Sequence, residues 1–89
     1  MAITPDGLRA RILAALPGAA VQVHDTTGGG DHFAAVVVAE AFAGKSLVDR
    51  HRAVYAALGE AMRSDVHALA LETLTPAEQA AKAGKKETR

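Results

Sequence analysis

The stretch AAVQVHDTTGGGDHFAAVVVA, residues 19–39, decides the fold, because it joins two strand-like runs through a glycine-rich loop. In the first run, residues 19–25, apolar and polar side chains alternate, which is typical of a strand with one covered face. The second run, residues 32–39, is apolar on both faces and therefore indicates a central strand. Turn composition alone predicts the loop between them, which contains Gly28-Gly29-Gly30. Together the two runs predict an antiparallel hairpin with an enlarged loop.

Helix signals flank this hairpin on both sides. Before it, Thr4-Pro5-Asp6 predicts a helix start with Thr4 as the cap, and Pro17-Gly18 ends that helix. After it, Ser46 is a candidate N-cap for a long helix. The apolar stripe of the long helix is expected to face the core, and it comprises Leu47, His51, Val54, Tyr55, Leu58 and Met62.

One more strand and one more helix complete the chain. Residues 66–73 alternate as a third strand, and Thr75-Pro76-Ala77-Glu78 begins a short, alanine-rich helix. The sequence therefore predicts an α+β domain in the order helix, strand, strand, helix, strand, helix. Its small sheet is expected to have three strands and to be mixed, with helices on one face, because the long helix permits a parallel crossover. Residues 1–83 are assigned to this single domain, and the polar residues 84–89 to a disordered tail.

Composition disfavours several kinds of function. The chain has no cysteine, so it offers neither disulfides nor thiolate ligands. Its formal net charge of zero disfavours nucleic acid as the main partner. We do not expect an enzyme, because Ser46 and Ser64 have the context of a cap and a turn rather than of a nucleophile. No signal-peptide pattern follows Met1, and no apolar run approaches the roughly 20 residues that span a bilayer. A cytoplasmic protein without a membrane partner is the expectation.

Two histidines at the starts of strands are the candidate ligands. His32 follows the glycine loop, and His67 has the same parity as Leu69 and Leu71 in the third strand. If both strands enter the sheet from the same edge, the two imidazoles can converge. The alternatives are a hydrogen-bonded structural histidine at position 67 and a surface loop histidine at position 32. Asp31 is either a hydrogen-bond acceptor that orients His32 or a turn residue.

Basic residues around the long helix are candidates for partner contacts. Arg50 is predicted to meet a partner carboxylate, with a solvated helix face as the alternative, and Arg52 and Lys45 are further partner-binding candidates. His51 lies on the apolar stripe and is expected to pack there with a hydrogen bond. Tyr55 is expected in the core with its hydroxyl reaching the edge.

Several segments, in the same order, resemble the BolA family. These segments are Gly30-Asp31-His32-Phe33, Gly44-Lys45-Ser46-Leu47-Val48, Arg50-His51-Arg52 with Val54-Tyr55, Val66-His67-Ala68-Leu69, and Thr73-x-Thr75-Pro76-x-Glu78. The resemblance extends from about Leu8 to Lys82, which is nearly the whole chain. It implies a fold similar to class II KH domains.

The resemblance also implies a partner and a cofactor. BolA-like proteins are regarded as partners of monothiol glutaredoxins with a Cys-Gly-Phe-Ser motif, and a [2Fe–2S] cluster is held between the two proteins. The glutaredoxin and glutathione each give a sulfur, and the BolA partner gives a third-strand histidine and a loop histidine or cysteine. Carried over to this chain, these ligands are His67 and His32. The isolated chain is then expected to hold no cluster and to be a monomer or weak homodimer.

An alternative function and two departures accompany the resemblance. Family members have also been linked to transcriptional control, so a DNA-binding regulator that uses the long helix is the alternative. Against it, Gly44-Lys45-Ser46-Leu47 lacks the second glycine of the nucleic-acid loop of KH domains. The glycine loop has no cysteine, which matches the histidine-type members. The family's usual tryptophan after Thr-Pro-x-Glu is Gln79 here, which predicts weaker docking of the last helix.

Overall fold

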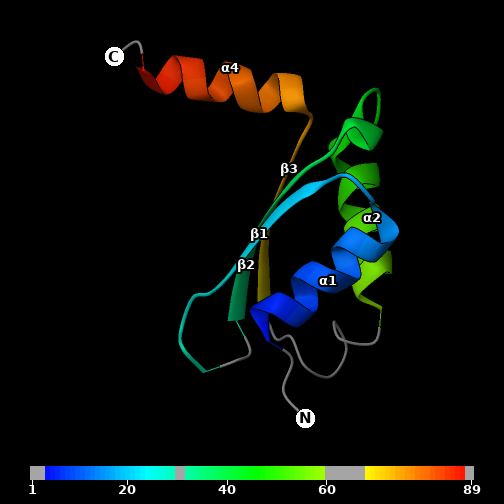
Figure 1. The fold of residues 1–89 in the computed structure, drawn as a ribbon, viewed down its shortest axis with the longest axis vertical. Helices are drawn as coiled ribbons and strands as arrows, with labels where there is room; N and C mark the ends of the chain where they lie inside the picture. Colours follow the sequence, from blue (N-terminus) through cyan, green and yellow to red (C-terminus); the bar gives the residue numbers. More distant parts are fainter. Residues whose placement is uncertain (1–3, 30–31, 60–67, 88–89) are drawn as a thin grey trace.

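The computed structural model describes residues 4–29, 32–59 and 68–87, and confirms the predicted α+β order. The elements are α1 (Pro5–Ala15), β1 (Ala20–Asp25), β2 (His32–Val38), the 3-10 helix η1 (Glu40–Phe42), α2 (Leu47–Leu58), β3 (Ala68–Leu74) and α4 (Pro76–Glu87). In Figure 1, α1 and α2 lie together on one side of the sheet, and α4 points away from it.

The sheet has three strands in the order β1-β2-β3, with β2 in the centre. β1 pairs antiparallel with β2, so that Val23 lies opposite Ala35. β2 and β3 are parallel, and their register places His32 opposite Ala68 and Val38 opposite Leu74. A parallel pair needs a crossover connection, and the chain segment between these strands contains α2. β2 and β3 therefore begin at the same edge of the sheet, which we call the entry edge.

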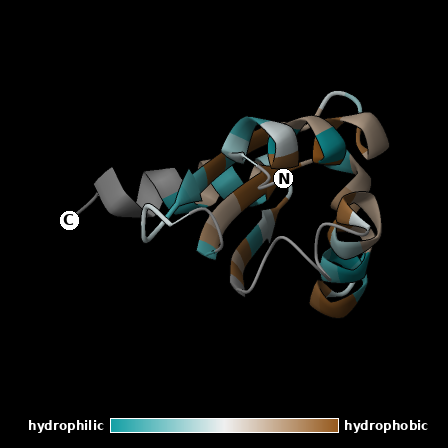
Figure 2. Cartoon of the chain, turned by 90° about the horizontal axis from the view of Figure 1, so that it is seen from below, coloured by the Kyte–Doolittle hydropathy of each residue, from teal (hydrophilic) through white to brown (hydrophobic). Residues whose placement is uncertain are grey.

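The core lies between the sheet and the two helices α1 and α2. In β2, Phe33, Ala35 and Val37 are buried and alternate with half-buried residues, as the strand period requires. In Figure 2, hydrophobic and hydrophilic segments alternate along the strands and around the helices. The buried cluster comprises Leu8, Ile12, Val21, Phe33, Val37, Ala39, Phe42, Val54 and Leu58. Burial of these apolar side chains is the main favourable term in folding.

Side chains at the helix starts act as the sequence predicts. Thr4 Oγ1 accepts a hydrogen bond of 3.0 Å from the Gly7 N–H, and Ser46 Oγ accepts one of 3.1 Å from the Asp49 N–H. α2 ends at Leu58, and Gly59 follows with a φ of 55°, a backbone conformation that favours glycine. The predicted continuation of this helix to Met62 lies outside the described residues.

The outer part of the predicted α2 stripe is not in the core. Leu47 is 61% exposed and Tyr55 is 39% exposed, whereas Val54 and Leu58 are buried. The physical reason is that Leu47 stands at the first position of α2 and Tyr55 lies about 100° around the helix from the buried Val54. Arg50, one turn before Val54, lies against the Phe42 ring with its charged carbon 5.9 Å from the ring centroid. The expectation that Leu47 and Tyr55 are core residues is therefore wrong.

The last helix is longer than expected. α4 continues to Glu87, so the prediction of a disordered tail is wrong for residues 84–87, while 88–89 lie outside the described residues. Alanine, lysine, glutamine and glutamate are strong helix formers and make up most of this segment, whereas Gly84 costs only about 1 kcal/mol relative to alanine. Side chains from Pro76 to Lys82 are all exposed, which agrees with the weak docking predicted from Gln79.

Leucines at the two ends of α2 allow a test of this packing. We expect Leu58→Ala to lower the free energy of unfolding by about 2–5 kcal/mol, because Leu58 is fully enclosed. Leu47→Ala, the matched control, should change it by about 0.5 kcal/mol or less, because Leu47 is exposed. Urea unfolding followed by circular dichroism measures both, and similar losses for the two variants would contradict the packing described.

Candidate functional site

The entry edge carries one of the two predicted ligands. His32 is the first residue of β2, is half-buried, and lies opposite Ala68 in the parallel register. Neighbouring strands of a sheet lie about 4.8 Å apart. His67 lies outside the described residues, and it directly precedes Ala68 in the chain. The structure thus confirms that β2 and β3 enter from one edge, which was the condition set for the two histidines to converge.

Hydrogen bonds fix the loop on both sides of its glycines. Asp25 Oδ1 accepts from the Thr27 N–H at 3.2 Å and from the Gly28 N–H at 2.8 Å, in the manner of an Asx turn. Gly28 itself has a φ of 81°, which favours glycine at this position. At the other end, the Thr26 N–H and Oγ1 both donate to the His32 carbonyl, at 2.9 and 3.1 Å. His32 is therefore anchored through its backbone, and the predicted neighbour Asp31 lies outside the described residues.

The possible ligand atoms at the entry edge could supply only part of the coordination of a metal group. Neutral imidazole is a good ligand for iron, and this chain has no cysteine that could add a thiolate. Within the described ranges, no three histidine, aspartate or glutamate side chains lie together as a metal site. A cluster bound here would need further ligands from another molecule.

A second group of polar contacts centres on Arg50. Its Nη1 and Nη2 donate to Glu78 Oε1 and Oε2 at 2.7 and 3.2 Å, which is a bidentate pair. Its Nε donates to the Lys45 carbonyl at 3.1 Å, and its Nη1 also reaches the Thr73 carbonyl at 3.4 Å. We call these residues, together with Phe42, the Arg50 cluster. Only 11% of the Arg50 side chain is exposed.

Glu78 takes part both in this cluster and in the capping of α4. Its Oε1 accepts from the Thr75 N–H at 2.9 Å, and its own N–H donates to Thr75 Oγ1 at 3.1 Å, which is a capping box. The hydrogen bond from Arg50, followed by that from the Thr75 backbone, lowers the pKa of Glu78 to about 2. The same hydrogen bond raises the pKa of Arg50.

These internal contacts bear on the predicted partner-binding residues. Arg50 joins α2 to η1, β3 and α4, so its guanidinium is engaged within the chain, which argues against the predicted contact with a partner carboxylate. Lys45 and Arg52 are exposed and form no ion pair within the described residues. The capping box could be read from Thr75-x-x-Glu78, but nothing in the sequence indicates that Glu78 pairs with a residue 28 positions earlier.

His51 and Tyr55 form the remaining contact of interest on α2. Their rings meet edge-on, with centroids 6.4 Å apart and an interplanar angle of 80°. The His51 Nε2 is shielded and has no hydrogen-bond partner among the described residues, so the expected hydrogen bond is not found for this atom.

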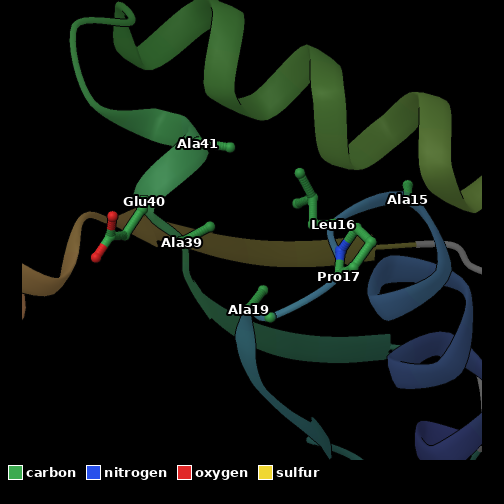
Figure 3. A pocket seen from close by; sticks show the side chains of 8 residues that line it. Ala15, Leu16, Pro17, Ala19, Ala39, Glu40 and Ala41 are labelled. Atoms are coloured by element: carbon green, nitrogen blue, oxygen red, sulfur yellow. The ribbon is translucent and has the colours of Figure 1, made fainter.

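The candidate residues occupy two opposite ends of the sheet. His32 begins β2, whereas Thr73 of the Arg50 cluster lies opposite Val37, near the end of β2. Strands rise about 3.3 Å per residue, so these ends are separated by about 17 Å along the sheet. A hollow of about 400 Å³ also lies at the far end, between the α1–β1 turn and η1. Figure 3 shows it lined by small side chains and by Leu16 and Pro17, with the Glu40 carboxylate turned outward.

Fold and site together define a small α+β domain whose mixed sheet carries a histidine at its entry edge. The family model described as BolA-like protein matches residues 17–78. This chain therefore belongs to the BolA-like family, as the resemblance of its motifs implied.

Particular relatives support this membership. A BolA protein homologue from Coxiella burnetii has a solved structure that superposes with a TM-score of 0.74 at 40% identity, covering 88% of this chain and 97% of that one. The DNA-binding transcriptional regulator BolA of Escherichia coli is 42% identical over 53 residues, which are 58% of this chain and 50% of that protein. SufE-like protein 1 of Arabidopsis thaliana is 45% identical over 60 residues, 67% of this chain and 16% of that protein.

This chain thus spans half or less of the length of these two curated relatives. Within the described ranges, no helix has both the length and the apolar character needed to cross a membrane.

The Arg50 cluster predicts a pH dependence of stability. The pKa of Glu78 falls from 4.5 to about 2 on folding, so its stabilising contribution is complete above pH 4.5 and is lost as the pH falls towards 2. We therefore expect the stability difference between the wild type and Glu78→Gln to shrink over this interval. Urea unfolding midpoints from pH 6 to pH 2 measure it.

Glu40→Gln is the matched control for this experiment, because Glu40 is exposed and forms no ion pair within the described residues. It should keep the wild-type pH dependence. A difference between the wild type and Glu78→Gln that stays constant from pH 6 to pH 2 would show that Glu78 is not held ionised by Arg50.

Proposed function

We propose that this protein is a non-enzymatic adaptor that shares a [2Fe–2S] cluster with a monothiol glutaredoxin and glutathione, in cluster trafficking or sensing. One observation carries the proposal: His32 opens β2 directly opposite Ala68, the residue that follows His67. Membership of the BolA-like family supports it, because the resemblance implied these two histidines as ligands.

The side chains of this chain favour a cluster that is shared with another protein over a cluster that this chain binds alone. His32 and His67 would supply the two imidazole ligands, and all thiolates would come from the partner and glutathione because this chain has none. When bound, such a cluster supplies one-electron redox chemistry, at a higher potential than with four thiolates. The protein's own part is to hold His32 through the hydrogen bonds from Thr26, so that its backbone stays fixed at the edge of the sheet.

One of the relatives contains its BolA domain within a longer chain, which fits a domain that acts together with another protein. The Arabidopsis SufE-like relative is much longer than the matched region, and a solved structure is described as the BolA domain of SufE1 from that plant. The same fold thus occurs as a module within a larger chain, which supports a role as an adaptor.

The alternative function is a DNA-binding regulator, which the name of the Escherichia coli relative favours. Lys45 and Arg52 offer exposed positive charge on and next to α2. Arg50 is much less available for DNA, because Glu78 neutralises it within the chain. The zero net charge of the chain further weakens this alternative.

The ligand assignment is tested by reconstitution. Mixed with a monothiol glutaredoxin, glutathione, iron and sulfide, the wild type should form a heterodimer whose visible absorption and circular dichroism differ from those of the glutaredoxin homodimer. The double variant His32→Ala/His67→Ala should lose this heterodimer spectrum. Gln22→Ala, the control, should retain it, because Gln22 is exposed on β1 opposite Val36, four residues along β2 from His32. An unchanged spectrum in the double variant would rule out both ligands.

The regulator alternative makes a different prediction. Binding to duplex DNA should weaken steeply as salt rises, since it depends on phosphate contacts, and Lys45→Ala/Arg52→Ala should weaken it and flatten its salt dependence. Fluorescence anisotropy at low and moderate salt measures this. If no binding is found even at low salt, the regulator alternative is excluded.

A further inference from the structure

The face of the sheet that points away from α1 and α2 carries two histidines. In β2, Phe33 and Ala35 are buried in the core, and His32 belongs to the opposite face because side chains alternate along a strand. In β1, His24 pairs with Ala34 and therefore lies on the same face as His32. His24 is exposed and His32 is half-buried. Two imidazoles thus share one face of the hairpin.

The register of the hairpin makes these two histidines diagonal neighbours. His24 lies opposite Ala34, and His32 precedes Ala34 by two residues on the adjacent strand. Diagonal neighbours of this kind are about 7–8 Å apart, which is within reach of aromatic and other long side chains. Two nitrogens bound to one zinc ion can themselves be up to about 4 Å apart, because each bond is about 2.0–2.1 Å long. The two imidazoles can therefore bind one ion together.

The neighbours of the pair leave space for an ion above the sheet. On this face His24 is opposite Ala34, and Ala34 is in turn opposite Ala70 of β3. The methyl groups of these alanines neither cover an ion nor compete for it. Within the described strands, the one carboxylate on this face is that of Glu72, which lies further along the sheet and pairs with Lys82. The imidazoles are therefore the metal ligands that this part of the face offers.

The backbone holds both histidines in place before an ion binds. His24 lies within β1, which pairs with β2 from Ala20 to Asp25, and the His32 carbonyl accepts the two hydrogen bonds from Thr26. Binding an ion therefore restricts only side-chain torsions, and preorganised groups bind with less loss of entropy. In the unfolded chain, positions 24 and 32 are joined by a flexible, glycine-containing segment, so the ion should favour the folded state.

Two imidazole ligands indicate the class of ion. Imidazole suits Zn²⁺, Cu²⁺ and Ni²⁺, whereas Mg²⁺ and Ca²⁺ prefer oxygen ligands. This chain has no cysteine, so the site gains no thiolate from it. Polar contacts of the fold do not account for His24, which forms no hydrogen bond or ion pair within the described ranges. Water would fill the remaining coordination positions, which makes the bound ion exchangeable.

We propose that His24 and His32 together bind one divalent transition-metal ion, with Zn²⁺ as the representative ion, across the β1–β2 hairpin. The site needs neither a glutaredoxin nor a cluster, so it goes beyond the proposed function. It nevertheless shares His32 with the proposed cluster, and a neutral imidazole has only one nitrogen free to act as a ligand. An ion bound to this pair therefore keeps His32 from the cluster until the ion leaves.

The test is a titration of the untagged, chelator-treated chain with zinc chloride, followed by isothermal titration calorimetry. We expect binding of one ion per chain, and an affinity at least tenfold weaker for His24→Ala and for His32→Ala. The double variant should bind little more weakly than either single variant, because removal of one imidazole already abolishes the chelate. Gln22→Ala, which changes the same face of β1, should bind like the wild type, and magnesium chloride should give no binding.

Each outcome decides the proposal. Absence of zinc binding by the wild type, or wild-type affinity in either single variant, overturns it. Loss of binding in His67→Ala with wild-type affinity in His24→Ala would assign the ion to the two proposed cluster ligands instead. Thermal unfolding without metal checks the fold of the variants, and His24→Gln, at an exposed position, remains decisive if His32→Ala is unfolded. The proposed function fails separately, when reconstitution yields no heterodimer spectrum.

Discussion

The parallel pairing of β2 with β3 is the constraint on which the rest of this molecule depends. Parallel neighbours cannot be joined by a tight turn, so the chain must cross over, and α2 lies in that crossover. Because the crossover returns the chain to where β2 began, His32 and Ala68 come to lie side by side. The core between α2 and the sheet, and the shared entry edge, are thus both consequences of one strand pairing.

Local chemistry explains which parts of this fold the sequence could predict. The caps at Thr4 and Ser46 and the alternation of β2 depend on residues a few positions apart, and the structure confirms them. Contacts between distant residues could not be predicted: Arg50 meets Glu78 across 28 positions. Nor does the apolar stripe of α2 indicate that Leu47 is 61% exposed. The helix beyond Gly84 was missed because its charged composition is equally common in tails.

The candidate site was also predictable only in part. Parity and turn composition predicted that both histidines start strands. His32 does begin β2, opposite Ala68, whereas His67 lies outside the described residues. Arg50 was a partner-binding candidate, with a solvated helix face as the alternative, and the structure shows its guanidinium paired with Glu78 within the chain. Of the predicted partner-binding residues, Lys45 and Arg52 are exposed, and they lie in the turn before α2 and on α2 rather than on the strands of the entry edge. Arg50 therefore has a structural role, and the nearby Lys45 and Arg52 remain candidates for partner contacts.

The hydrogen bonds from Thr26 to the His32 carbonyl have a consequence for the strength of ligation. Fixing the backbone of one residue costs about 1–2 kcal/mol of conformational entropy, and here folding has already ordered it. Only the side-chain torsions of His32 are left to be restricted when a metal is captured. Ligands presented on the first residue of a paired strand therefore bind with less loss of freedom than ligands on a loop. In the proposed complex, the hairpin register rather than the glycines beside it sets how much freedom His32 loses on binding iron.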